Sequence, residues 1–533
     1  MKHLCTTLLL AGLFVATACR DYLDVNTNPN APQSVAPNLY LPPMLHWMVT
    51  SPQYDGRFVG HYTQEWISTS TLFDPSQSWG RMGYQAGNDA GAMQWRDVYW
   101  SLGQNLVDMN TKAEAEKRWD LLGVGLILKA WGWQVLTDLH GEIIIQEAFQ
   151  STRTTFDYDT QQYAYQEIKR LLDSAIVLLR RSDDAVDQAY LAVGDRIYNG
   201  DRLKWLKFAH GMLALHLNHY SNKVSLYDPT QVIAEVDSSF VSNADDPLLA
   251  YPSTSNDDRN FLGPTRDNIT LYRQTQFIVN LMNGTQFGGV VDPRLSRMLA
   301  IDSANTTYTG LNINDVTPQT TFGAFSATAS APQRPRNLFG YTAGGAGLPG
   351  RYIFDDKTKL PVITYAQLQF IKAEAALRKG DPATARTAYM AGISAHIDFV
   401  NDRNRDIGST PAQITSTEKT AFLGSPEIVP PLGSLTLSHI MSQKVIAQFG
   451  WGHNEMWLDM RRYHYTDLDP VSGIEVFRGF AAPTALFGDN GGFLVQRIRP
   501  RFNSEYVWNR PGLDAIGGLA TDYHTKDLWI IQP

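Results

Sequence analysis

Apolar residues recur at helical spacing in several blocks along the chain. Residues 112–139 carry one such stripe, which ends at a His-Gly stop signal at 140–141. The members of this stripe are Leu121, Val124, Leu128, Trp131 and Val135. Residues 160–180 and 201–220 carry similar stripes. Because a stripe of this kind buries one face of a helix against a core, the three blocks predict three amphipathic helices.

A clear pair of helices is expected further along the chain. Residues 363–378 and 383–400 both have helical periodicity, and the sequence KGDP between them predicts a turn. Small residues would let the two helices cross closely: Ala373, Ala376 and Ala385. This run looks like a tetratricopeptide repeat. One such unit cannot bury its face alone, so we expect the earlier helical blocks to stack beside it.

The rest of the pattern consists of one more helical block, a few strand signals and long loops. Residues 438–463 predict the last helical block, and residues 142–146 and 473–477 predict short strands. Segments rich in Asn, Gly, Ser, Thr and Pro predict extended loops at 24–38, 242–268, 302–350 and 466–492. The expected fold class is therefore mainly α, with tetratricopeptide-like helix pairs and long loops.

The first nineteen residues have the three-part order of a secretory signal peptide. A positive start is followed by an apolar core at 8–15, which is too short to span a bilayer of roughly 30 Å. Ala16, Thr17 and Ala18 precede Cys19, as in a lipoprotein signal, although Ala16 stands where Leu is usual. We predict a cleaved leader of residues 1–18 and lipidation of Cys19. The alternative is an ordinary signal peptide with a stray cysteine.

Cysteine usage supports the lipid anchor. The chain has two cysteines, Cys5 inside the predicted leader and Cys19 at its end. A disulfide, a cysteine-ligated zinc ion and a cysteine nucleophile in the mature chain are therefore excluded. Two or more acyl chains on Cys19 would hold the protein firmly to a membrane.

Composition narrows the classes of partner. The net charge of the 533 residues is −8 and there is no basic run, which argues against nucleic acid as a partner. A long apolar run, 121–139, contains Lys129, Gln134 and Asp138, so it predicts a buried helix and not a membrane span. Aromatic residues make up 11% of the chain, enough to supply both a core and a ligand platform. The length allows two or three domains, or one large domain.

Several segments together resemble SusD/RagB-type nutrient-binding lipoproteins of the Bacteroidetes outer membrane. They are CRDYLDVNTNPNAP from Cys19, LTDLHGEIIIQEAF at 136–149, DPRLSRML at 292–299 and QKVIAQFGWGHNEMWLDMRRY at 443–463. One departure is that Ile144 and Ile145 stand near a position where the family usually has proline. The similarity covers nearly the whole chain after the leader. Its pattern is similar to the SusD-like 2 branch.

The resemblance implies a fold and a function. The fold would be a single domain over 19–533, in which tetratricopeptide-like helix pairs form a right-handed superhelical scaffold with a loop-rich ligand-binding face. The protein would be anchored through its lipid to the outer membrane, exposed at the cell surface. It would capture an oligosaccharide or a peptide and act as the lid of a SusC-like, TonB-dependent transporter. Members of the family are not enzymes, and no cofactor is implied.

Motifs with catalytic potential are weak. The string GAGLPG at 345–350 fits a dinucleotide-binding pattern by count, but no βαβ unit surrounds it. His210, His216 and His219 lie on one predicted helix, where a third metal ligand is missing, so a polar core explains them better. We therefore expect neither a metal nor a nucleotide.

A charged cluster near residue 460 has a structural explanation. It contains Glu455, Asp459, Arg461 and Arg462. Since Asp459 and Arg462 are three residues apart on a helix, we expect an ion pair that stabilises the fold. A glycoside hydrolase would need two carboxylates across a cleft, and no motif selects such a pair. A cell-surface glycoside hydrolase and a protein-binding helical-repeat adaptor remain the alternatives to a nutrient-binding protein.

Aromatic residues among polar ones indicate where a ligand could bind. Sugars present flat C–H faces ringed by hydroxyl groups, so their sites combine aromatic platforms with hydrogen-bonding groups. Residues 62–100 have this mixture with weak periodicity, which predicts an exposed loop, whereas the pattern of Trp95 to Trp100 is typical of a core helix. Residues 256–277 offer a second contribution. The candidate ligand-binding residues are Trp66, Phe73, Trp79, Tyr84, Asn256, Arg259 and Tyr272.

Overall fold

The computed structural model describes residues 35–68, 78–266, 268–269, 272–301, 307–314, 338–340, 352–406 and 412–533. Helices make up 54% of the structure and strands make up 4%, so the predicted fold class, mainly α, is confirmed. The predicted leader, Cys19 and Phe73 lie outside the described residues. Among the residues that are described, no helix is long and apolar enough to cross a membrane.

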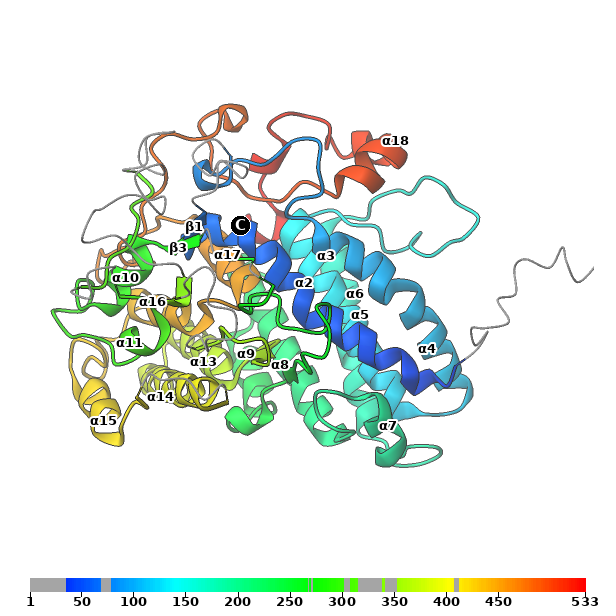
Figure 1. The fold of residues 1–533 in the computed structure, drawn as a ribbon, viewed down its shortest axis with the longest axis horizontal. Coiled ribbons are helices and arrows are strands. Elements are labelled where there is room, and N and C mark those ends of the chain that lie inside the picture. Colours follow the sequence, from blue (N-terminus) through cyan, green and yellow to red (C-terminus); the bar gives the residue numbers. More distant parts are fainter. Residues whose placement is uncertain are drawn as a thin grey trace, which may run out of the picture.

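The first half of the chain is built from helices that follow one another closely. They are α2 (Leu41–Tyr62), α3 (Met93–Arg96), the π-helical segment η4 (Asp97–Gly103), α4 (Gln104–Ala115), α5 (Trp119–His140), α6 (Gln161–Leu179), α7 (Gln188–Gly194), α8 (Arg202–His219) and α9 (Pro229–Asp237). Figure 1 shows α2 running across the front of the molecule, with α5 and α6 behind it.

The second half of the chain adds helices and a C-terminal region rich in loops. The helices are α10 (Gln276–Met282), α11 (Leu295–Met298), α13 (Tyr365–Lys379), α14 (Pro382–Asp406), α15 (Ser416–Gly424), α16 (Leu437–Gln448), α17 (His453–Arg462), the π-helical segment η9 (Phe502–Trp508) and α18 (Arg510–Ala515). The segment between α17 and η9 has little regular structure.

Helix ends follow the signals in the sequence. The side chain of Thr160 accepts a hydrogen bond from the backbone N–H of Tyr163 and caps α6, and Asp201 caps α8 in the same way. Gly380, with a φ of +80°, ends α13 in the left-handed conformation that glycine adopts without strain. The helices predicted at 160–180, 201–220, 363–378 and 383–400 are confirmed.

Two of the predicted helical blocks are each divided between two helices in the structure. The block 112–139 is split between the end of α4 and α5, because Lys117 takes a left-handed conformation (φ +55°) between them. The block 438–463 divides into α16 and α17 around Gly450, whose φ is +87°. Turns of this kind are not visible as breaks in an apolar stripe, since the stripe continues on both sides.

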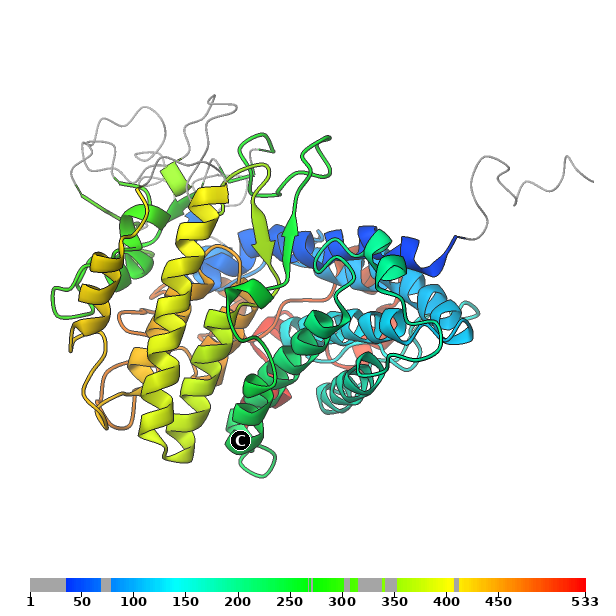
Figure 2. The ribbon, with the colours of Figure 1, turned by 90° about the horizontal axis from the view of Figure 1, so that it is seen from below.

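Helix pairs stack to form the scaffold. Helix α5 packs on α6, α6 on α8, α8 on α9, α9 on α13, and α13 on α14. Figure 2 shows α13 and α14 side by side as a hairpin. Each pair covers the apolar face of the next, which gives the superhelical scaffold expected of tetratricopeptide-like units.

Strands are few and short. Strand β1 (Trp66–Ser68) pairs antiparallel with β3 (Tyr272–Gln274), and β2 (Leu248–Ala250) pairs antiparallel with β4 (Lys359–Pro361). The strands predicted at 142–146 and 473–477 are wrong, since each has a single bridge. The Asp159 carboxylate accepts the backbone N–H groups of Ile145 and Gln146, which removes donors that a strand ladder would need.

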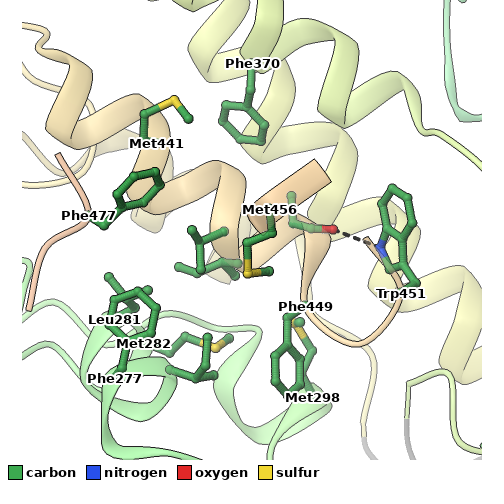
Figure 3. Close-up of a cluster of buried hydrophobic side chains, with 14 of the residues drawn as sticks. Phe277, Leu281, Met282, Met298, Phe370, Met441, Phe449, Trp451, Met456 and Phe477 are labelled. Atoms are coloured by element: carbon green, nitrogen blue, oxygen red, sulfur yellow. Dashed lines mark hydrogen bonds between the residues drawn. The ribbon is translucent and has the colours of Figure 1, made fainter. Parts of the chain in front are cut away.

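The core behind the C-terminal half is aromatic and rich in methionine. Figure 3 shows side chains from α10, α13, α16 and α17 meeting in one cluster, in which Phe370 and Met456 are completely buried. Trp451 donates its indole N–H to the carbonyl of Ala447 at 3.0 Å, which ties the turn after α16 to that helix. This core fixes α17 against α13 and α16.

Candidate ligand-binding site

A hollow of about 200 Å³ opens between two segments that are far apart in the sequence, 79–92 and 497–521. In Figure 1 these segments lie together at the top of the molecule, on the side of α18. We call it the Tyr84 hollow. Its aromatic walls are Tyr62, Trp79, Tyr84, Phe502 and Tyr506. Pockets that enclose a whole small ligand measure about 300–1,000 Å³, so this one suits a single ring of a larger molecule.

Tyr84 and Arg499 form one wall. The guanidinium carbon of Arg499 lies 4.1 Å from the centre of the Tyr84 ring, a cation–π contact. The Tyr84 hydroxyl donates a hydrogen bond to Asp489 Oδ2 at 2.8 Å. Burial and this bond raise the pKa of Tyr84 to about 12, so the phenol is neutral at physiological pH.

Neutral oxygen atoms hold Arg499 in place. Its Nη1 donates to the Tyr506 hydroxyl at 2.8 Å and to the Gly518 carbonyl at 3.4 Å. Its Nη2 donates to the carbonyls of Ala520 and Thr521. The Nε–H is buried without an acceptor among the described residues. Arg499 is therefore fixed by the backbone of the C-terminal loop, and not by a carboxylate.

Trp79 forms the back of the hollow. It is 2% exposed, and its ring packs against Phe58 at 4.9 Å and Tyr62 at 5.4 Å between centroids. Its indole N–H is buried and has no acceptor in the part of the chain that the structure describes. The backbone at Gly91 (φ +78°) approaches so closely that a Cβ atom there would lie 2.7 Å from the Trp79 ring. A small residue at 91 thus sets the position of this wall.

Trp66 and Tyr272 do not lie on an exposed loop, which corrects the sequence expectation. They lie on the paired strands β1 and β3, are 0% and 3% exposed, and have ring centres 6.3 Å apart. The imidazole of His453 also packs on Trp66, at 4.8 Å. The polar residues next to Trp66 in the sequence suggest an exposed position. Side chains from distant helices bury it instead, and the local pattern does not show them.

The second expected segment does not reach the hollow. Asn256 is exposed, and Arg259 is half-buried with its Nε donating to Ser253 Oγ at 3.1 Å within its own loop. Neither residue lines the Tyr84 hollow. Of the predicted candidates that the structure describes, only Trp79 and Tyr84 line the Tyr84 hollow.

The C-terminal half of the hollow was not predicted. Arg499, Phe502 and Tyr506 lie in the sequence RIRPRFNSEYVW at 497–508, which mixes aromatic and polar residues with weak periodicity. The same signal marked residues 62–100. It was present here too, but the sequence does not show that the two segments meet.

The charged cluster near residue 460 is a buried network, which we call the ionic hub. It consists of Glu374, Lys444, Glu455, Asp459 and Arg462. Arg462 binds Asp459 at 2.6 Å and Glu374 at 2.8 Å, and Lys444 binds Asp459 at 2.7 Å and Glu455 at 3.2 Å. The predicted structural ion pair is confirmed. The hub joins α13, α16 and α17.

Two histidines of α8, His216 and His219, belong to this polar core, whereas His210 Nδ1 lies 2.7 Å from Glu235 Oε2. His219 Nε2 lies 2.9 Å from Glu455, and His216 Nδ1 lies 2.6 Å from Gln134 Oε1. Nowhere in the described ranges do three or more His, Cys, Asp or Glu side chains come together as a metal site would require. These side chains therefore have structural partners.

A family model decides what kind of protein this is. The model of SusD-like 2 proteins, described as starch-binding and associating with the outer membrane, matches residues 29–476. The chain belongs to the SusD-like 2 family. The resemblance seen in the sequence is thus confirmed, and this family is one of cell-surface proteins associated with the outer membrane.

Solved structures of SusD-like proteins share the fold. A SusD/RagB family protein from Bacteroides thetaiotaomicron is 19% identical, with a TM-score of 0.66 over 93% of this chain and 99% of its own. A SusD homologue from Bacteroides fragilis is 19% identical, with a TM-score of 0.69 over 93% and 100%. A chitin-binding SusD homologue from Flavobacterium johnsoniae is 20% identical, with a TM-score of 0.67 over 93% and 98%.

At these identities the likeness shows the fold alone. No curated protein matches the chain by sequence.

Proposed function

We propose that this protein captures a glycan at the cell surface, holding one sugar ring in the Tyr84 hollow. The observation that carries the proposal is the combination of aromatic walls with the amide side chains of Gln85 and Asn88 around one hollow. Aromatic faces suit the C–H face of the same ring.

A glycan is favoured over a peptide by what two related structures are described as binding. The hollow presents amide and backbone groups at 85–88 (Gln-Ala-Gly-Asn) beside its aromatic walls. Two of the related structures are described as chitin-binding, the homologue from Flavobacterium johnsoniae and a second protein 21% identical to this chain. Chito-oligosaccharides are therefore the first probes, and peptides serve as the comparison.

The proposed activity is binding without catalysis. Hydrolysis of a glycosidic bond needs two carboxylates flanking it, at roughly 5–10 Å from each other. The residues that line the Tyr84 hollow include neither Asp nor Glu. A hydrolase is thus the weaker alternative.

The proposal extends to the anchor and the partner. A lipid on Cys19 would tether the protein to the outer membrane, and a SusC-like, TonB-dependent transporter would receive the captured glycan with this protein as its lid. Membership of the SusD-like 2 family supports both points. Co-purification of a barrel transporter with the full-length lipoprotein from its own membrane tests the partner, and its absence counts against the lid.

Calorimetry tests the binding site. The mature chain carrying Cys19→Ser is titrated with chito-oligosaccharides, oligomers of other common polysaccharides, and peptides. We expect saturable binding of one glycan class, no release of shorter products, and weaker binding by Tyr84→Ala. Turnover of a glycan supports the hydrolase, and binding of peptides alone overturns the glycan proposal.

A further inference from the structure

A second hollow, of about 270 Å³, lies next to the first. We call it the Trp100 hollow. Its walls are aromatic and apolar: Trp95, Tyr99, Trp100, Ile144, Phe149 and Phe156. The sequence pattern predicts Trp95 to Trp100 as core, and Trp95 is indeed buried, but Trp100 is 75% exposed. The π-helical segment η4 presents this indole to solvent at the rim of a concave surface.

Both arginines of the Trp100 hollow are paired with carboxylates. Arg96 pairs with Asp97 at 2.8 Å, and Arg501 pairs with Asp89 at 2.8 Å. Buried Glu505 accepts hydrogen bonds from the hydroxyl of Tyr158 and the amide of Asn509. These pairs leave a surface that suits an uncharged ring with hydroxyl groups.

Ser504 adds a hydrogen-bonding group to this surface. Its hydroxyl is buried at the wall of the hollow and has no partner among the described residues. An aromatic platform beside an unpartnered hydroxyl is the same kind of chemistry as in the Tyr84 hollow.

The two hollows share their walls. Ala90 and Ala92 line the Tyr84 hollow, and the next turns of the same segment, 95–100, line the Trp100 hollow. In the same way Phe502 and Tyr506 face one hollow, while Ser504 and Glu505 face the other. One ridge, η9 with the segment before it, therefore separates them.

The ridge is held rigidly. Asp89 pairs with Arg501 at 2.8 Å and accepts the backbone N–H of Asn503 at 3.0 Å, so it joins the two segments at the point where the hollows meet. A helix with its side chains is roughly 10–12 Å across, so a chain of several sugar units would cross the ridge.

We propose that the Trp100 hollow is a second binding subsite, which takes a further sugar ring of the same glycan chain by stacking on Trp100. The inference rests on the proposed function of the Tyr84 hollow. A glycan that occupies both hollows gains affinity because the second contact is intramolecular. The protein would therefore select chains long enough to bridge the ridge over short fragments.

Chain length is the variable that tests this inference. The mature chain is titrated with chito-oligosaccharides from the dimer to the octamer, or with the oligomer series of whichever glycan binds in the screen above. Trp100→Ala is compared with the parent and with Trp508→Ala. Trp508 is 72% exposed on η9 but lines neither hollow, so it is the matched control.

We expect the parent to bind long oligomers more tightly than short ones. Trp100→Ala should bind short oligomers as the parent does and long oligomers roughly three- to tenfold more weakly, the worth of one aromatic contact. Trp508→Ala should match the parent throughout. Equal thermal unfolding of the three proteins shows that the fold is intact.

The outcomes separate the two proposals. Affinity that does not rise with length, or Trp100→Ala that matches the parent on long oligomers, overturns the second subsite alone. Absence of glycan binding by the parent, or binding that Tyr84→Ala leaves unchanged, overturns the proposed function and the inference that rests on it.

Discussion

The ionic hub and the Tyr84 hollow hold polar groups in opposite ways. In the hub, Arg462 is completely buried and binds the carboxylates of Glu374 and Asp459. In the hollow, Arg499 lies against the Tyr84 ring, and neutral oxygen atoms take its Nη hydrogens. The hub thus pairs its charged groups with one another, whereas the hollow keeps aromatic rings and amide side chains beside an open space.

This difference shows why charge is a poor guide to function in this chain. The cluster around Asp459 looks catalytic in the sequence, but its members stabilise the contact between three helices. Groups suited to a ligand lie instead in loops whose polar residues are mostly uncharged. Breaking each region should therefore have different consequences, on stability for the hub and on affinity for the hollow.

The largest effect is expected from Arg462→Met. Removal of this charge leaves two buried carboxylates short of a partner, and we expect the free energy of unfolding to fall by about 3–5 kcal/mol. Urea unfolding followed by circular dichroism measures it. Arg405→Met is the matched control, because Arg405 and Asp402 form the same i,i+3 pair on an exposed helix face. The control should change the free energy of unfolding by less than about 1 kcal/mol.

Equal losses in the two variants would show that burial adds nothing to the hub. The buried ion pairs of the hub would then contribute no more to the free energy of unfolding than an exposed ion pair does.

Acid should weaken the hub. Burial alone raises the pKa of Glu455, but His219 and Lys444 outweigh it and lower the pKa to about 2. A carboxyl group with a lowered pKa in the folded state stabilises the protein above its unfolded pKa, about 4.5, and loses this contribution as the pH falls. We expect the free energy of unfolding to drop by a few kcal/mol between about pH 4.5 and pH 2.

Glu455→Gln removes the titrating group, so its unfolding free energy should be lower at neutral pH and depend less on acid over the same range. Parallel pH profiles for the variant and the parent would show that Glu455 is not held ionised by its neighbours. Thermal unfolding at a series of pH values decides between the two.

Substitutions in the Tyr84 hollow should lower the affinity for the glycan and leave the free energy of unfolding nearly unchanged. Tyr84→Ala removes an aromatic wall and the contact with Arg499, and we expect glycan binding to weaken about tenfold, or about 1.4 kcal/mol. Tyr84→Phe keeps the ring and loses the hydrogen bond to Asp489, so it should bind nearly as the parent does. Calorimetry measures both. Equal losses in the two variants would assign the effect to the hydroxyl group and contradict a stacking role.

Much of the fold could be predicted because its signals are local. Thr160 and Gly380 stand at helix ends, where capping chemistry marks the boundary. Helix α2 has no side-chain cap at its start, and Pro52 with the buried polar residues Gln53 and Asp55 interrupts its apolar stripe. Its burial depends on neighbours from α17 and α3, which local periodicity does not show.

The site could be predicted only in part, for a related reason. Trp79 and Tyr84, which line the hollow, were selected because aromatic residues lie among polar ones, but Trp66 has the same surroundings in the sequence and does not line it. The difference comes from distant residues: His453 packs on Trp66, while Arg499 leaves Tyr84 facing a hollow. Contacts over some 400 residues are a property of the fold and not of the local pattern.

The smallest effect is expected at Gly91, and it tests whether the backbone sets the wall of the hollow. Gly91→Ala places a methyl group 2.7 Å from the Trp79 ring, in addition to the strain of a left-handed residue (φ +78°). Gly473→Ala introduces a similar strain (φ +68°) with no atom within 4 Å of the new Cβ. We expect each variant to lose about 1 kcal/mol of stability from the backbone.

The two glycine variants should differ in affinity for the glycan. Displacement of Trp79 would weaken binding roughly two- to threefold in Gly91→Ala, whereas Gly473→Ala should bind as the parent does. Because the backbone strain is matched, the difference between them reports the position of the indole alone. Equal affinities would mean that Trp79 is a core residue which only borders the hollow, and the binding wall would then consist of Tyr84, Arg499 and the aromatic residues of η9.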